Sequence, residues 1–112
     1  MPPKKNPLGL NPLQLKTLTL LQEIARLENA PADEAGAFKV TQLPHAHGNH
    51  FHLGDAVVSG RDATGLSNPA VWTVLERKGL VRSNEPNGVI LTADAMGYDT
   101  GLRDTILHRS DH

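Results

Sequence analysis

Four of the chain's six histidines fall within nine residues, in the stretch PHAHGNHFH over positions 44–52. Imidazole nitrogens bind zinc, nickel and copper, and imidazole changes its charge near neutral pH. In a hairpin turning at Gly48 and Asn49, side chains two residues apart on each strand would share a face. The side chains that such a hairpin could bring together are His45, His47, His50 and His52.

The same histidines have a simpler interpretation. In the run HFHL, Phe51 and Leu53 alternate with His50 and His52, which predicts a strand with its histidines facing water. Histidines facing solvent on a strand are common and need no ligand. Solvated or interface histidines are therefore the first hypothesis. A zinc or nickel site and, after it, a pH sensor are the alternatives.

No other group of residues points to catalysis. The chain has no cysteine, which excludes disulfides, thiolate metal sites and thiol chemistry and is typical of a cytoplasmic protein. Its sequence shows no Ser-His-Asp order, no glycine-rich phosphate loop and no acid-flanked histidine pair. We expect a protein that is not an enzyme and that needs no cofactor.

Length and composition indicate one small domain. The 112 residues are 38% hydrophobic and 21% charged, with a net charge of −1, and a chain of this size forms a single modest core. Residues 1–10 hold three prolines and a lysine pair, which predicts a flexible arm before a single domain over 11–112. Neither a membrane span nor a secretory signal is expected. The near-neutral charge gives no strong electrostatic footprint for nucleic acid.

The first element expected to position these residues is a helix over 12–28. Asn11 suits its N-cap and Pro12 its first position, and apolar residues then recur at three- and four-residue steps. Leu20 and Leu27 widen the apolar stripe, which predicts burial on more than one side. We expect this helix, with the last helix of the chain, to provide a dimer surface.

Two short helices joined by a tight turn are predicted in the middle of the chain. Asp55 suits the cap of a first helix that runs to about Thr64. Ser67 suits the cap of a second helix, which ends at Gly79 because glycine adopts the left-handed conformation easily. Residues 55–78 are therefore predicted to form a helix-turn-helix.

Strands are predicted on either side of this helix pair. Apolar and polar residues alternate over 37–43, which predicts a strand. Residues 80–92 predict a hairpin, because their Asn-Gly pair tolerates the positive φ angles of a tight turn. A last helix is expected over 93–109, where Gly97 and Gly101 favour a break.

The order of these elements and one stretch of sequence resemble the winged-helix bacterial regulators of the multiple-antibiotic-resistance and arsenic-repressor types. In those families a recognition helix ends in Leu-Glu-x-Lys-Gly-Leu-Val, and a wing returns through Leu-Thr into a C-terminal helix. Here residues 75–81 read LERKGLV and residues 91–92 read LT. The resemblance covers about residues 50–96. It implies an α+β fold of the winged helix-turn-helix type, with a three-helix core, a small antiparallel sheet that forms the wing, and an extra C-terminal helix.

The resemblance also implies a transcriptional regulator that binds double-stranded DNA as a homodimer, with the helix over 67–78 in the major groove. The Asn68 side chain could form hydrogen bonds with adenine, and the Arg77 side chain could form them with guanine or phosphate. As an alternative, the outward residues of this region form an ordinary solvated face. The positions implied to face DNA are Arg61, Ser67, Asn68, Thr73, Arg77, Lys78, Arg82, Asn84 and Asn87.

Trp72 bears on two further hypotheses. It falls beside the inward stripe of its helix, so packing at the helix edge is its first interpretation, and contact in a dimer or partner interface is the second. A winged helix that docks proteins through Trp72 and the histidines is the alternative to DNA binding. A metal-responsive repressor is a third hypothesis, which requires the four clustered histidines to converge on one ion.

Overall fold

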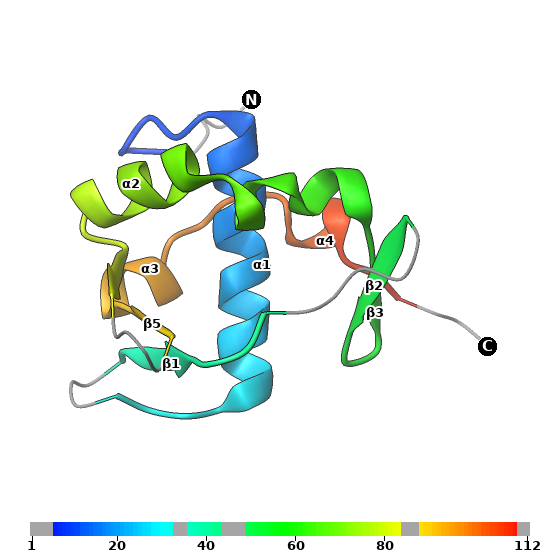
Figure 1. The fold of residues 1–112 in the computed structure, drawn as a ribbon, viewed down its shortest axis with the longest axis horizontal. Helices are drawn as coiled ribbons and strands as arrows, with labels where there is room; N and C mark the ends of the chain where they lie inside the picture. The colour runs from blue at the N-terminus through cyan, green and yellow to red at the C-terminus, as the bar shows by residue number, and fades with distance from the viewer. Residues whose placement is uncertain (1–5, 33–35, 44–48, 84–87, 110–112) are drawn as a thin grey trace.

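The computed structural model describes residues 6–32, 36–43, 49–83 and 88–109. Over these residues the chain is an α+β fold of five helices and two three-stranded antiparallel sheets (Figure 1). The helices are α1 (Pro12–Glu28), the 3₁₀ helix η1 (Gly60–Ser67), α2 (Pro69–Arg77), α3 (Ala93–Met96) and α4 (Arg103–Ile106). The strands are β1 (Phe38–Val40), β2 (His50–Leu53), β3 (Ala56–Ser59), β4 (Val81–Ser83), β5 (Val89–Leu91) and β6 (His108–Arg109).

Helix α1 is the centre of the molecule, with one sheet on each side of it (Figure 1). Its predicted start is confirmed: the Asn11 side chain accepts a hydrogen bond from the Gln14 N–H, and the Gln14 side chain accepts one from the Asn11 N–H. Residues 17–25 are buried without interruption. The broad apolar stripe is therefore covered within one chain, whereas we had expected part of it to serve a dimer. Leu27, at the end of the helix, stays 50% exposed.

The first sheet has the strand order β1–β5–β4, so the strand before the helix pair lies beside the hairpin that follows it. The predicted strand and hairpin are both present, although β1 is shorter than the range 37–43. Val40, Val81 and Leu91 face inward and are almost fully buried. This sheet therefore closes the core on the α2 side of α1.

The second sheet has the order β2–β3–β6, and its strand β3 replaces the first part of the first predicted middle helix. Residues 55–59 were expected to be helical, but β3 pairs with β2 across a turn at Gly54, whose φ is +57°. The prediction was wrong because Val57 and Val58 suit a pleated strand and β2 offers them an antiparallel partner. The helix begins only at Gly60.

Helices η1 and α2 follow one another with Asn68 as the single residue between them. Asn68, not Ser67, is the N-cap of α2, and its side-chain oxygen accepts from the Ala70 N–H at 3.0 Å. The expected cap was therefore one residue early. Helix η1 packs on α1 where Gly65 is fully buried beside Thr17. The absence of a side chain at Gly65 permits this close approach.

The turn from α2 into β4 forms as predicted. Gly79 has a φ of +78°, in the left-handed region that glycine adopts without strain. The Leu80 N–H donates to the Leu75 carbonyl, which closes the helix end. The Thr92 hydroxyl donates to the Gly79 carbonyl at 2.8 Å and accepts from the Ala95 N–H, so Thr92 caps α3 as expected. The tip of the hairpin, 84–87, lies outside the described residues.

The last predicted helix is broken, as Gly97 and Gly101 suggested: α3 and α4 are short and separated by residues 97–102. This segment is held on α1 by polar contacts. The Gln22 side-chain NH₂ donates to the carbonyls of Ala95 (2.7 Å) and Tyr98 (2.8 Å). After α4 the chain adds β6 to the second sheet, which the sequence did not suggest.

Polar side chains of α1 make two more contacts with the C-terminal segment, residues 93–106, which runs from α3 to α4. Thr19 and Thr100 are joined through their hydroxyls at 2.6 Å. The carboxylate of buried Glu23 lies 3.2 Å from the Arg103 guanidinium and 3.7 Å from that of Arg26. Buried polar groups are stable only when they are paired, so these residues fix where the segment lies.

Residues 6–10 depart from the expected flexible arm. Leu10 is 3% exposed and Leu8 packs against the core. The Tyr98 hydroxyl accepts from the Leu8 N–H at 3.1 Å and donates to the Asn6 side chain. These contacts anchor the segment that precedes α1. Residues 1–5 lie outside the described part of the chain.

Among the described residues, no helix is both long enough and apolar enough to cross a membrane.

Candidate nucleic-acid interface and histidine face

Five of the nine residues implied to contact DNA lie on α2 or within two residues of its ends: Ser67, Asn68, Thr73, Arg77 and Lys78. Ser67, Thr73, Arg77 and Lys78 are exposed, as expected. Three polar side chains of this region already have partners within the chain, the first being the Ser67 hydroxyl, which donates to the Thr64 carbonyl at 3.2 Å. The Asn68 oxygen is occupied as the helix cap, and the Thr73 hydroxyl donates to the Pro69 carbonyl at 3.0 Å. The exposed charged side chains of Arg77 and Lys78, at the end of α2, are therefore the groups of this region best placed to bind a ligand.

Strand β4 continues this basic surface onto the first sheet. Arg82 and Lys39 are each paired in register with Ile90 of the central strand β5, so the three side chains form one row on the outer face. Both basic residues are exposed. Strands in a sheet lie about 4.8 Å apart, which puts the two backbones about 10 Å apart. Lys39 was missed at the sequence level, because only the pairing of β1 with β5 brings it near the wing.

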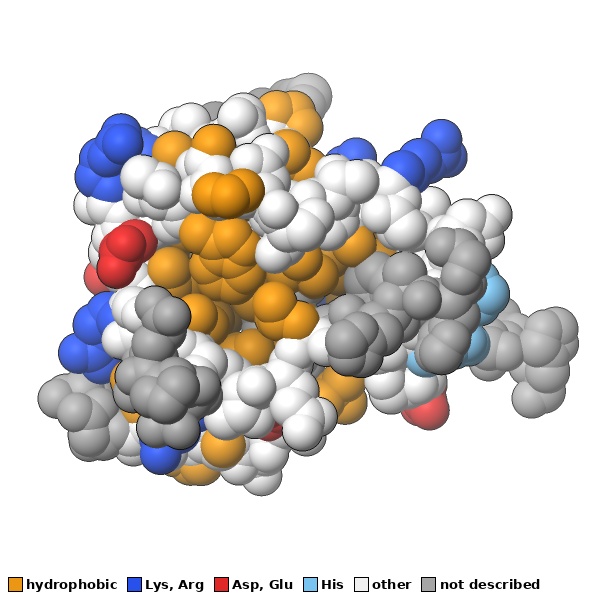
Figure 2. All heavy atoms as spheres, viewed as in Figure 1, with side chains coloured by type: hydrophobic (Ala, Val, Ile, Leu, Met, Phe, Trp, Pro, Cys, Tyr) orange, Lys and Arg blue, Asp and Glu red, His pale blue; other side chains and the backbone are white. Residues whose placement is uncertain are grey.

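The remaining residues implied to face DNA are spread more widely. Arg61 is exposed on η1. Asn84 and Asn87 lie outside the described residues. Acidic residues interrupt the basic surface: Glu76 is exposed on α2 and Asp94 on α3. Figure 2 shows the same mixture along its left edge, where basic side chains alternate with acidic ones. The surface is therefore basic only locally.

Trp72 packs inside the helix pair. Its side chain is half-buried against the core, and its ring N–H donates to the Leu66 carbonyl at 2.9 Å. This bond joins α2 to the end of η1. The structure therefore gives Trp72 the packing role that was its first interpretation, and a role in a partner interface stays a prediction.

Two of the four clustered histidines lie side by side on β2. The ring centroids of His50 and His52 are 5.2 Å apart, with the ring planes at 81°. His45 and His47 lie outside the described residues, so the convergence of all four stays a prediction. Within the described ranges, no three or more His, Asp or Glu side chains are grouped so that they could hold a metal ion.

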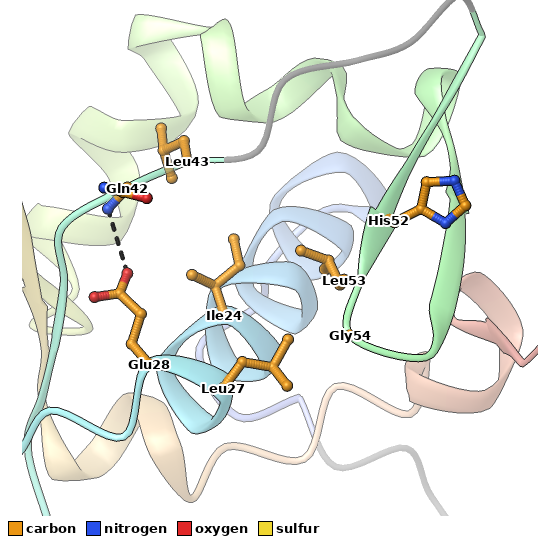
Figure 3. A pocket seen from close by; sticks show the side chains of 8 residues that line it. All are labelled: Ile24, Leu27, Glu28, Gln42, Leu43, His52, Leu53 and Gly54. Atoms are coloured by element: carbon orange, nitrogen blue, oxygen red, sulfur yellow. Dashed lines mark hydrogen bonds between the residues drawn. The ribbon is translucent and has the colours of Figure 1, made fainter.

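A shallow apolar groove of 270 Å³ lies between the end of α1, the segment after β1, and β2 (Figure 3). Ile24, Leu27, Leu43 and Leu53 are its apolar lining. Glu28 at its rim accepts from the Thr41 N–H (2.9 Å) and hydroxyl (2.8 Å) and from the Gln42 N–H (3.3 Å). Because these bonds engage the carboxylate, Glu28 anchors the segment after β1. The other lining residues are Gln42, His52 and Gly54, so the groove is a mostly apolar surface bordered by one imidazole.

Comparison with protein-family models, with curated proteins and with solved structures finds no match to this chain. The resemblance to winged-helix regulators therefore stays a prediction that depends on the motif residues and on the order of the elements.

Proposed function

We propose that the chain is a winged-helix DNA-binding protein that contacts double-stranded DNA through α2 and the β4–β5 hairpin. The observation that carries the proposal is the joint exposure of Arg77, Lys78 and Arg82 where the helix passes into the hairpin. The order of α1, β1, η1, α2, β4 and β5, with β1 beside β5, supports it, although the β2–β3 hairpin stands between β1 and η1. On this proposal α2 is the recognition helix and β4–β5 is the wing.

Electrostatics determine what kind of binding to expect. Phosphate neutralisation by Lys and Arg supplies essentially all of non-specific affinity for DNA. One chain offers Arg77, Lys78 and Arg82 near one another in sequence, with Lys39 and Arg61 on other elements, and its net charge is −1. We therefore expect weak binding by one chain, a steep loss of affinity with added salt, and useful affinity only when two chains bind together.

The test is fluorescence anisotropy on random-sequence duplex DNA over a salt series. Arg77→Glu and Arg82→Glu should each weaken binding and make the salt dependence shallower, by about one unit of log K against log salt for each phosphate that is no longer neutralised. Arg109→Glu is the matched control, because it makes the same change of charge in β6, in the sheet on the other side of α1 (Figure 1). Its affinity should stay close to that of the unaltered chain.

Two results would count against DNA binding. One is no binding at any salt concentration, which would favour a winged helix that docks another protein. The other is an equal loss of affinity in Arg77→Glu and Arg109→Glu, which would mean that overall charge matters and the α2 face does not.

A further inference from the structure

The histidine pair of β2 lies on a face of the second sheet that nothing so far explains. Residues alternate along a strand, so His50 and His52 share one face and Leu53 points to the other, into the groove (Figure 3). His50 is half-buried and His52 is exposed. In Figure 2 the histidine side chains gather at the right edge, on the other side of α1 from α2 and the first sheet.

The spacing of the two rings matches what one metal ion requires. Zinc binds imidazole nitrogen at about 2.0–2.1 Å and prefers four ligands in a tetrahedron. The ring centroid lies about 1.15 Å beyond the nitrogen, so each centroid is about 3.2 Å from the ion. Two imidazoles at the tetrahedral angle then have centroids about 5.2 Å apart, and two at a right angle have centroids about 4.5 Å apart. The observed separation of His50 and His52 is 5.2 Å. The rings are edge-to-face, and exposed His52 is free to turn its nitrogen toward the shared position.

We propose that His50 and His52 bind a zinc ion that two copies of this chain share. A closed zinc site takes four ligands, and within the described residues no third His, Asp or Glu joins this pair in a group that could hold a metal. A two-fold axis through the ion gives each copy the same two ligands, as an isologous dimer requires. The dimer surface is then the outer face of β2, not α1.

His108 gives the proposal an internal control. It shares the face with the pair, because His52 is paired with Val57 and Val57 with His108. Val57 lies between the two histidines, which puts their backbones about 10 Å apart at the usual strand spacing. His108 is exposed and lies outside the proposed ligand set. The site is also separate from the α2 face, so this inference does not depend on DNA binding.

The experiment measures the mass of the full chain by analytical ultracentrifugation with zinc chloride and then with excess EDTA. We expect zinc to double the mass, EDTA to reverse the change, and calorimetry to give one zinc for two chains. His50→Gln and His52→Gln should each abolish the doubling, while His108→Gln retains it. Circular dichroism checks that each variant is folded.

Several outcomes would overturn the proposal. Zinc bound at one ion per chain without a change of mass would show that a single chain completes the site. If zinc still doubles the mass of the His50→Gln, His52→Gln double variant, the contact between the two copies lies elsewhere. Loss of the doubling in a His45→Gln, His47→Gln variant would mean that the first two histidines of the cluster are ligands, and the two-copy arrangement of His50 and His52 would be wrong.

Discussion

Replacing Gly65 by alanine should destabilise the fold at the contact between η1 and α1. A Cβ at this position would lie 1.9 Å from the Thr17 Oγ1, 3.2 Å from the Thr17 Cβ and 3.4 Å from the Leu13 Cδ1. Thr17 is fully buried, and its hydroxyl donates to the Leu13 carbonyl at 2.9 Å. Either the threonine turns away and loses this bond, or the two helices move apart.

The size of the effect follows from two opposing contributions. Overpacking a close-packed site costs about 1–3 kcal/mol. Replacing glycine also lowers the entropy of the unfolded chain, which stabilises by about 0.4–1 kcal/mol. The expected net loss is about 1–2 kcal/mol in the free energy of unfolding, or roughly 4–8 °C in the melting temperature for a domain of this size.

Thermal and guanidinium unfolding followed by circular dichroism measure this loss. Gly97→Ala is the matched control, because the φ of Gly97 is −92° and an added Cβ would lie 3.6 Å from its nearest neighbour, the Ala93 carbonyl oxygen. This variant should be more stable than the unaltered chain by about 0.4–1 kcal/mol, because it lowers the entropy of the unfolded chain without a clash. Thr17→Ala removes the clashing oxygen, so Thr17→Ala with Gly65→Ala should cost less than the sum of the single changes. Strict additivity, or equal stability of Gly65→Ala and Gly97→Ala, would refute the reasoning.

Two further predictions concern the polar groups of α1. Asn11→Ala removes the side-chain oxygen that accepts from the Gln14 N–H and should cost about 1 kcal/mol in urea unfolding, whereas Asn11→Ser keeps a capping oxygen and should cost much less. Equal losses would show that the cap is not the cause. Gln22→Leu removes the side-chain donor that the Ala95 and Tyr98 carbonyls share and should cost about 1–3 kcal/mol. The Ala95 carbonyl keeps the Tyr98 N–H as a donor at 3.3 Å. An unchanged unfolding midpoint would mean that other contacts hold the C-terminal segment.

The candidate sites show where sequence reasoning ends. The exposure of Arg77 and Lys78 was predicted from the spacing of apolar residues along α2. In a helix that spacing alone determines which side chains face the core and which face solvent. That Lys39 lies near Arg82 depends on two strands about 50 residues apart in the sequence, and no local pattern encodes that pairing. The distance between the His50 and His52 rings likewise became available only with the structure, although alternation in β2 had already put both on one face.

Most features that the sequence determined by itself are caps and turns. The start of α1 at Asn11, the turn at Gly79 and the Thr92 cap all involve bonds between residues at most five positions apart or a conformation that only glycine adopts easily. The broken last helix belongs to the same class, because Gly97 and Gly101 weaken it locally.

Residues 55–59 show what the tertiary structure alone decided. Their local signals suited a helix cap, yet they form β3, because β2 on one side and β6 on the other supply partners for the backbone. The burial of α1 over residues 17–25 was decided in the same way, since η1, α2, the sheets and the C-terminal segment all pack on it. The pairing of β3 with β6 joins Ala56 to Arg109, which are far apart in the sequence. A helix face is buried only by the elements that fold onto it, so neighbouring residues could determine neither feature.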